Sequence, residues 1–317
     1  MDALYQELKK YGTVKQGAPL AKFTTFKIGG PAQFLVTVGD TQSLTLLLKY
    51  LVGEGVEYSL LGGGSNLLWS DDPYDGVVIK LETRKIVVAN GVLEVEAGAP
   101  LALVVATATQ NALSGLEWAA GVPGTVGGAV RGNAGAMDSD TAQTLLKVQI
   151  WRDGEVFELT PEECGFGYRD SLFKHDTSVV LKAWYKTMPG DKGAIQKKIA
   201  GYIQQRNGKY PPFPSAGSFF KNIPFAQWPG PLTDLPAQFA VKQQVPAGWI
   251  NEQNGLKGYQ LGGAMVSKEH GNFLINAQSA TEQDVLLVVE EVQRRAYTRF
   301  GVVLTPEVHI QSKKEAL

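Results

Sequence analysis

The spacing of apolar residues predicts several amphipathic helices along the chain. The clearest lies near the C-terminal end, where apolar residues recur at steps of three and four. Thr281 and Asp284 form a capping-box pattern at its start, and Gly301 is expected to end it. Thr41 is expected to open a further helix that Gly53 closes. The predicted helices are residues 1–11, 41–53, 101–111, 193–207 and 281–301.

Runs rich in Val, Ile and Leu between these helices predict strands. Asn90-Gly91 and Asp153-Gly154 are typical two-residue hairpin turns, so the flanking strands are expected to pair antiparallel. The mixture of helices and frequent hairpins indicates an α+β fold. The predicted strands lie within residues 34–38, 56–61, 76–81, 85–98, 145–160, 179–188 and 302–310.

Two segments interrupt these patterns. Residues 210–217, YPPFPSAG, are rich in proline and are expected to lack regular structure and to mark a domain boundary. Residues 223–248 carry Pro, Trp and Gly with weak periodicity, which predicts a loop-rich insertion.

Composition narrows the classes of function. The 317 residues include 30 Lys and Arg and 31 Asp and Glu, which gives a net charge of −1. Without an excess of positive charge, a nucleic-acid partner is not expected. The one cysteine, Cys164, allows no internal disulfide, and His175, His270 and His309 show no metal-ligand spacing, so we expect no bound metal. The apolar runs are too short for a membrane span, and the first residues lack a signal-peptide core. We therefore expect a cytoplasmic protein without a membrane partner.

The candidate chemistry begins at three consecutive glycines, Gly62, Gly63 and Gly64, which Ser65 and Asn66 follow. No Lys stands where a Walker loop needs one, and no long helix is predicted where a Rossmann fingerprint needs one. A tight turn and a loop whose N–H groups hold an anion both remain possible. Two further glycine-rich stretches, residues 24–32 and 115–136, favour one extended cofactor that all three share.

Seven motifs, in order and over nearly the whole chain, resemble those of one enzyme family. They resemble the UDP-N-acetylenolpyruvylglucosamine reductases, also called UDP-N-acetylmuramate dehydrogenases or the MurB family. One of them, GLEWAAGVPGTVGGAVRGNAGA, contains the second glycine cluster. The other six are TTFKIGG, LGGGSNLL, YRDSLFK, PSAGSFFKN, GGAMVSKEHGNFLINAQSAT and PEV.

The resemblance implies a vanillyl-alcohol-oxidase-like (PCMH-like) FAD-binding domain in two parts and a smaller C-terminal α+β substrate domain. It implies non-covalent FAD, NADPH as co-substrate, and reduction of the enolpyruvyl ether of a UDP-sugar to UDP-N-acetylmuramate, a peptidoglycan precursor. The implied divisions are residues 1–80 and 81–208 for the FAD-binding subdomains, 209–305 for the substrate domain, and 306–317 for a segment returning to the active site.

The resemblance also assigns roles to residues. Arg169 would bind the substrate carboxylate, Ser218 would donate a proton, and Glu307 would stabilise the enolate-like species. Without the resemblance, these would be interpreted as a surface ion pair, a cap and a surface carboxylate. Tyr168, Lys209 and Asn222 would contact the substrate. The residues expected at the FAD are Gly62, Gly63, Gly64, Ser65, Asn66, Gly121, Val122, Pro123, Gly124, Gly127 and Gly128.

The chain departs from the family pattern in a few places. Lys27 and Arg131 stand where relatives often have Arg and Met. The stretch between Arg169 and Lys209 is too short for a tyrosine-bearing loop found in one subgroup, so the chain resembles the subgroup that lacks it. Two other hypotheses remain: an FAD-dependent alcohol oxidase or dehydrogenase of the same fold, and a flavin-binding module without activity. No His or Cys in the glycine-rich stretches could tether a flavin.

Overall fold

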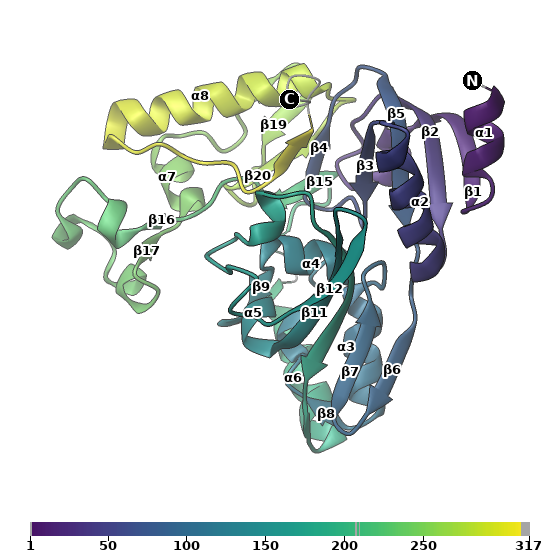
Figure 1. Cartoon of the computed structure of the whole chain (residues 1–317). Helices are drawn as coiled ribbons and strands as arrows, with labels where there is room; N and C mark the ends of the chain where they lie inside the picture. The colour runs from purple at the N-terminus through teal and green to yellow at the C-terminus, as the bar shows by residue number, and fades with distance from the viewer. Residues whose placement is uncertain (1, 207, 209, 312–317) are drawn as a thin grey trace. The chain divides into compact units, whose positions relative to one another are not determined.

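The chain divides into two units that each contain separate stretches of sequence. The structure is a computed structural model, drawn whole in Figure 1, and it describes residues 2–206, 208 and 210–311. Unit 1 consists of residues 2–18, 32–63 and 74–206, and unit 2 consists of residues 19–31, 64–73, 208 and 210–311. Unit 2 therefore takes two short segments from the N-terminal part of the chain.

The first sheet of unit 1 has four strands and is partly parallel. The strand order is β1-β2-β5-β3, and both β2 and β3 run parallel to β5. Helix α2 buries Leu44, Leu47, Leu48 and Leu51 in the same core as this sheet. The side chain of Asp40 accepts a hydrogen bond from Ser43 N and caps α2. The elements are α1 (Asp2–Leu8), β1 (Thr13–Pro19), β2 (Pro31–Val38), α2 (Thr41–Gly53), β3 (Tyr58–Leu61) and β5 (Tyr74–Leu81).

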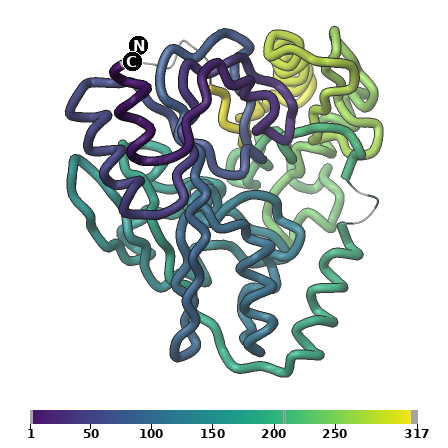
Figure 2. Tube along the Cα trace, turned by 90° about the vertical axis from the view of Figure 1, so that its right-hand side faces the viewer, coloured from purple at the N-terminus to yellow at the C-terminus, as the bar shows by residue number. Residues whose placement is uncertain are grey.

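The second sheet of unit 1 has five antiparallel strands in the order β12-β11-β13-β7-β6. Both predicted hairpins are confirmed, with positive φ at Asn90, Gly91, Asp153 and Gly154. Apolar residues of α3 and α4 share a core with this sheet, and α6 lies beside α3 (Figure 2). The elements are β6 (Ile86–Ala89), β7 (Val92–Glu96), α3 (Leu101–Gln110), α4 (Val126–Gly132), β11 (Leu145–Arg152), β12 (Glu155–Leu159), β13 (Val179–Lys186) and α6 (Lys192–Arg206).

Short elements complete unit 1. Strands β9 and β10 form one two-stranded pair, and β8 and β14 form another. The bounds are β8 (Leu113–Ser114), η2 (Glu117–Ala119), β9 (Gly135–Ala136), β10 (Ser139–Asp140), α5 (Thr141–Thr144), η3 (Leu172–Lys174) and β14 (Met188–Pro189).

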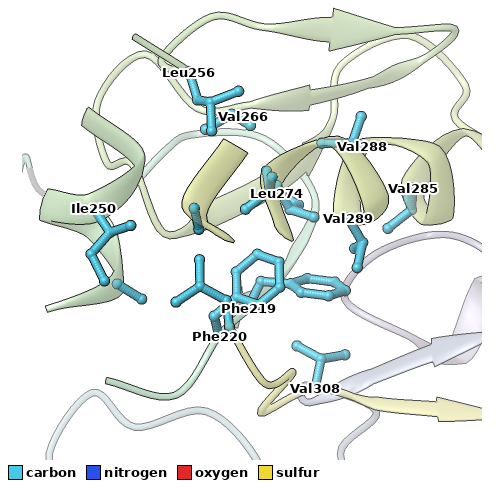
Figure 3. Close-up of a cluster of buried hydrophobic side chains, with 14 of the residues drawn as sticks. Phe219, Phe220, Ile250, Leu256, Val266, Leu274, Val285, Val288, Val289 and Val308 are labelled. Carbon is cyan, nitrogen blue, oxygen red and sulfur yellow. The ribbon is translucent and has the colours of Figure 1, made fainter. Parts of the chain in front are cut away.

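Unit 2 is a four-stranded sheet, in the order β15-β20-β19-β18, that packs against helix α8. Its buried apolar core is drawn in Figure 3, where Phe219 and Phe220 lie near valines of α8. Strand β4 pairs parallel with β21. The main elements are β4 (Leu67–Trp69), β15 (Ser215–Ser218), α7 (Ala247–Gln253), β18 (Gln260–Leu261), β19 (Ala264–Val266), β20 (Phe273–Asn276), α8 (Glu282–Phe300) and β21 (His309–Gln311).

The remaining elements of unit 2 are short. They are η1 (Leu20–Phe23), β16 (Ile223–Pro224), η4 (Phe225–Gln227), η5 (Leu232–Asp234), η6 (Ala237–Val241) and β17 (Gln244–Val245). The single turns and two-residue strands after Asn222 confirm the predicted loop-rich insertion.

The α+β class and the five predicted helices are confirmed, with differences at their ends. The capping box at Thr281 and the left-handed Gly301 cap are both present on α8. The first helix ends at Leu8, and α2 is capped by Asp40 rather than by Thr41. Two expectations were wrong: residues 215–218 form β15, and the final strand covers only His309–Gln311. Helix α4, in the glycine-rich stretch, was not predicted.

Candidate active site

The first and second glycine clusters meet backbone to backbone inside unit 1. A Cβ built on Gly63 would lie 2.7 Å from Gly124 Cα, and one built on Gly62 would lie 2.6 Å from Thr125 Oγ1. A side chain at either position would push the two segments apart. Glycine is therefore required here by close approach of two segments rather than by a turn alone.

Two polar side chains of unit 1 lie at this contact. Lys80, on β5, donates a hydrogen bond from Nζ to the carbonyl of Gly62. Thr125 is 6% exposed, and none of the described residues offers its hydroxyl a hydrogen-bond partner. Burial lowers the pKa of the Lys80 ammonium. A positive charge and an unpartnered hydroxyl thus stand beside the glycine backbone, as an anion site requires.

The rest of the second cluster has more varied surroundings. Gly121 has φ +72, and its carbonyl accepts a hydrogen bond of 2.8 Å from Arg206 Nη1. Gly127 N donates to Ala97 O at 2.8 Å, and a Cβ on Gly127 would lie 3.1 Å from Ala97 Cβ. Gly121 therefore contacts the end of α6, whereas Gly127 packs α4 against Ala97, which follows strand β7 of the second sheet. Val122 is half-buried, whereas Pro123 and Gly128 are exposed.

The end of the first glycine cluster belongs to unit 2. Gly64 has φ +62, and a Cβ there would lie 2.2 Å from Phe23 O. Ser65 is half-buried, and Asn66 follows it. The Asn66 side chain donates from Nδ2 to Glu307 O at 3.2 Å, so this segment lies beside the one that carries Glu307.

The third glycine patch has a structural explanation within unit 2. Gly30 N donates to Ser70 O at 2.7 Å, and a Cβ on Gly30 would lie 2.2 Å from Asp71 O. Gly29 has φ +140 and lies against Trp69. Gly29 and Gly30 therefore let two segments of unit 2 pack closely.

Ser218 and Glu307 come from neighbouring backbone segments of unit 2. Ser218 is the last residue of β15, and Glu307 N donates to the carbonyl of the next residue, Phe219, at 2.7 Å. A β-bridge between Phe220 and Pro306 continues the pairing. Both Ser218 and Glu307 are half-buried. The structure thus brings together two of the three predicted catalytic residues.

Arg169 occupies a tight turn of unit 1. Gly167 and Asp170 exchange backbone hydrogen bonds of 3.1 and 3.2 Å, which leaves Tyr168 and Arg169 at the tip. Arg169 has φ +55, a left-handed conformation that is uncommon for residues other than Gly, Asn and Asp. Such strain concentrates at functional sites. The guanidinium carbon lies 5.5 Å from the centre of the Tyr168 ring.

Contacts with neighbouring segments fix this turn. Arg169 Nη2 donates to Gly135 O at 2.7 Å, and Nη1 donates to Asn133 O at 3.4 Å. Asn133 Nδ2 donates to Gly167 O at 2.9 Å, and Lys174 Nζ donates to Arg169 O at 2.7 Å. The guanidinium and the backbone of the turn are both held from outside the turn.

The predicted substrate residues differ in what the structure shows of them. Tyr168 is 40% exposed beside Arg169. Asn222 lies in unit 2, where its Oδ1 accepts from Ala247 N at 3.2 Å and its Nδ2 donates to Gln244 Oε1 at 3.4 Å. Its amide therefore connects the segment that follows β15 to the end of the insertion. Lys209 lies outside the described residues.

Sequence reasoning missed Lys80, Thr125 and Asn133. Lys80 is a single cation that follows the apolar run of residues 77–79 in its strand, and Thr125 is a hydroxyl inside a glycine cluster. Both signals are visible in the sequence, but their meaning depends on the contact between the two clusters. Within the described part of the chain, no group of three or more His, Cys, Asp or Glu side chains could hold a metal, and no helix could span a membrane.

Comparisons with known proteins identify the family. The model of an FAD binding domain matches residues 32–160, and that of the UDP-N-acetylenolpyruvoylglucosamine reductase C-terminal domain matches residues 208–311. The reductase of Carboxydothermus hydrogenoformans is 38% identical over 97% of each chain, and that of Bacillus pumilus is 37% identical over 98% of each. The chain belongs to the UDP-N-acetylenolpyruvoylglucosamine reductase family.

A solved structure of this reductase family supports the assignment. The crystal structure of the reductase (MurB) from Thermus caldophilus has a TM-score of 0.75 and 33% identity, and covers 95% of this chain and 98% of that one. The predicted fold, an FAD-binding domain followed by a C-terminal reductase domain, is confirmed. The predicted four-part division and the predicted subgroup stay predictions.

The residues present fit FAD, the cofactor of this reductase family's FAD-binding domain. The matched region includes both glycine clusters that meet at Gly63 and Gly124. Small residues allow a large ligand close to the backbone, while Lys80 and Thr125 supply a charge and a hydroxyl. No covalent attachment is needed for such a site. The predicted cofactor is confirmed by the family match.

Proposed function

We propose that this protein reduces UDP-N-acetylglucosamine enolpyruvate to UDP-N-acetylmuramate, with NADPH as the reductant and FAD as the bound cofactor. Similarity over nearly the whole length to enzymes named UDP-N-acetylenolpyruvoylglucosamine reductase carries this proposal. The product is a precursor of peptidoglycan. We infer a cytoplasmic location for the protein from its proposed substrates, because NADPH and nucleotide sugars are cytoplasmic metabolites.

The reaction adds hydrogen across a carbon–carbon double bond conjugated to a carboxylate. FAD, when bound, would supply the transfer of hydride from NADPH to the alkene. Hydride adds to the terminal carbon, electrons move toward the carboxylate, and a proton then adds to the carbon that bears the ether oxygen. The net change consumes NADPH and one proton. The protein must therefore bind the carboxylate, stabilise the enolate-like charge and supply the proton.

We assign to Arg169 the binding of the substrate carboxylate and the stabilisation of the negative charge that develops on it. A guanidinium stays charged and can form a bidentate pair with a carboxylate. The left-handed backbone of Arg169 and the carbonyls that hold its guanidinium support this role, since both fix the group before substrate arrives. Tyr168 on the same turn would shape the pocket.

We assign donation of the proton to Ser218. We assign stabilisation of the enolate, alongside Arg169, to a Glu307 that holds a proton or shares one through hydrogen bonds, because an ionised carboxylate would repel the developing negative charge. The neighbouring backbones of Ser218 and Glu307 in unit 2 support a shared role, because Glu307 N bonds the residue that follows Ser218. A serine hydroxyl is a weak acid, so it needs a group that stabilises its anion or replaces its proton. Lys209 and Asn222 remain our proposed partners of the substrate diphosphate.

An anaerobic titration tests the proposed function. NADPH is added to the FAD-loaded protein, and bleaching of the flavin absorbance reports the first half-reaction. UDP-N-acetylglucosamine enolpyruvate is then added without oxygen, and return of the oxidised spectrum reports the second. Return of absorbance only on admission of air would instead indicate an oxidase of the same fold. Protein that binds FAD but is not bleached by NADPH would indicate a module without activity.

A further inference from the structure

Lys80 holds the start of the glycine loop from the neighbouring strand. In the parallel pairing of β3 and β5, the Cα of Lys80 is opposite that of Leu61, the last residue of β3. The loop begins at the next residue, Gly62, whose carbonyl accepts the hydrogen bond from Lys80 Nζ. The cation therefore lies where the strand ends and the loop begins.

The hydrogen bond also fixes the direction of the next N–H group. In a trans peptide the C=O and the following N–H point in opposite directions, and no described peptide bond is cis. Because Lys80 holds the carbonyl of Gly62, the N–H of Gly63 points away from the lysine. An ammonium has three donors, so donors remain after this bond.

The charge of Lys80 is not neutralised by the groups around it. The charged side chains that act on Lys80 are Glu82 and Arg84. These two form an ion pair with each other, with 3.4 Å between Arg84 Nη2 and Glu82 Oε1. Within the described residues, Lys80 itself takes part in no ion pair. Burial without a carboxylate partner disfavours the charged ammonium, in line with its lowered pKa. An anionic ligand at this position would remove that penalty.

Thr125 provides an independent observation at the same position. It is 6% exposed, its hydroxyl has no hydrogen-bond partner among the described residues, and that hydroxyl faces Gly62. A buried hydroxyl without a partner is costly, and native proteins rarely keep one without a reason. A ligand oxygen beside Gly62 would satisfy it.

We propose that Lys80 and Thr125 are side-chain partners of the FAD diphosphate in unit 1. Lys80 supplies the positive charge that the glycine backbone lacks, and Thr125 donates a hydrogen bond. The inference rests on FAD binding, which is part of the proposed function. It deepens that function, because it names the groups that recognise the charged portion of the cofactor.

The test measures FAD affinity, not turnover. Protein stripped of FAD is titrated with FAD, and quenching of flavin fluorescence gives Kd. Lys80→Met is expected to raise Kd at least about tenfold, which corresponds to about 1.4 kcal/mol. Lys80→Gln, which keeps a donor but no charge, should behave like Lys80→Met, while Lys80→Arg should retain most of the affinity. Lys147→Met, which removes an exposed lysine on β11, is the control.

Salt dependence of the unaltered protein gives a second readout. An ion pair with the diphosphate makes Kd rise with salt concentration, and Lys80→Met should flatten this slope. A Kd independent of salt would overturn the role of Lys80 even if Lys80→Met failed to fold. Wild-type affinity in Lys80→Gln would also overturn it, since Lys80 would then act only as a donor to Gly62.

Thr125→Val separates ligand binding from packing. Valine has nearly the same shape without a hydroxyl, so the stripped protein should melt at the same or a higher temperature than wild type. Kd for FAD should rise about two- to tenfold, the range for one hydrogen bond. Unchanged Kd would remove Thr125 from the site. If the wild-type protein bound no FAD, the proposed function itself would be refuted. If Kd for FAD changed in neither Lys80→Met nor Thr125→Val, only this inference would be refuted.

Discussion

Ser218 is the residue on which the proposed chemistry depends most directly. Ser218→Ala should leave FAD binding and bleaching by NADPH intact, because neither needs the hydroxyl. Return of the oxidised flavin on addition of the enolpyruvyl substrate should slow about a hundredfold to ten-thousandfold, the usual contribution of a general acid. Ser215→Ala, on the same strand β15, is the control. Near-normal return in Ser218→Ala would exclude Ser218 as the proton donor.

The strained turn at Arg169 makes Lys174 a positioning residue. The left-handed backbone of a non-glycine residue costs about 1–2 kcal/mol, and Lys174 opposes this cost by bonding the carbonyl of Arg169. Lys174→Met should slow reoxidation by substrate about tenfold. NADPH bleaching and FAD affinity should not change, and Lys174→Arg should restore part of the rate. Equal slowing of both half-reactions would indicate general damage to unit 1 instead.

Gly63 should tolerate no side chain. The Cβ of alanine would lie 2.7 Å from Gly124 Cα, so the two glycine clusters would have to separate. Overpacking of this kind costs about 1–3 kcal/mol, and Gly63→Ala should weaken FAD binding by about tenfold or more. At Gly39 a Cβ would meet nothing within 4 Å, so Gly39→Ala is the matched control. Fluorescence titration gives Kd for FAD in both variants. Equal Kd values for Gly63→Ala and Gly39→Ala would contradict the importance of the Gly63–Gly124 contact.

The glycine clusters show how far the sequence can lead at the residue scale. Three glycines before Ser65 indicate unusual backbone freedom, but a turn and an anion site remain equally consistent with them. The choice between a turn and an anion site depends on the close approach of Gly63 to Gly124. These residues are 61 positions apart (124 − 63), so no local sequence pattern encodes their contact. Likewise, Lys80 is typical of an exposed strand position until its contact with Gly62 is known.

At the scale of elements, helix α8 was predictable because its signals are local. Thr281 and Asp284 cap each other's backbone, and apolar residues follow a helical spacing. Helix α4 was not, because Gly127 and Gly128 are poor helix formers, and contacts with β13 and Ala97 stabilise it instead. Strand β15 escaped prediction for a similar reason, since its pairing with β20 is set by distant residues.

Glu291 should make the stability of α8 depend on pH. Hydrogen bonds from Arg294 Nε at 2.7 Å and Arg295 Nε at 2.6 Å lower the pKa of Glu291 from 4.5 to about 2. Because the folded pKa is depressed, the stabilisation is present above pH 4.5 and is lost as pH falls toward 2. Solvent screening keeps it below about 1 kcal/mol, since the Arg294 side chain is 63% exposed.

Urea unfolding of Glu291→Gln at several pH values tests this dependence. The variant should be less stable than wild type near neutral pH, and the difference should shrink as pH falls through the range between 4.5 and 2. Glu290→Gln, at an exposed position of the same helix, is the control. A difference that stays constant across the range would show that the ion pair is not its cause.

At the scale of the whole molecule, unit 2 is assembled from three stretches of sequence. Its core includes Phe26 and Ile28 from residues 19–31 and Leu68 from residues 64–73. Strand β4, which pairs with β21, comes from the same early part of the chain. The longest of the three stretches begins at Gly208. The two inserted segments could not be foreseen, because their apolar residues resemble those of any local core.

A fragment of residues 208–317 should therefore not fold by itself. It lacks three buried core side chains and the partner of β21, and loss of one large buried side chain alone costs about 3–5 kcal/mol. We expect no near-ultraviolet circular dichroism and no cooperative thermal transition for the fragment. The full-length chain is the reference, and Phe26→Ala in that chain should lower its melting temperature. A cooperative transition in the isolated fragment would contradict this account of unit 2.

The pairing of β4 with β21 has a consequence for how the protein is made. Asn66 and Glu307, which lie beside this pair, are bonded although 241 residues separate them. A ribosome builds the chain from its N-terminus, so β4 leaves the exit tunnel long before its partner exists and keeps an unpaired edge until residues 309–311 have been made. A message truncated upstream of the codon for His309 would leave that edge uncovered permanently. The codons for residues 309–311 thus complete a structure whose first part, residues 67–69, was translated much earlier.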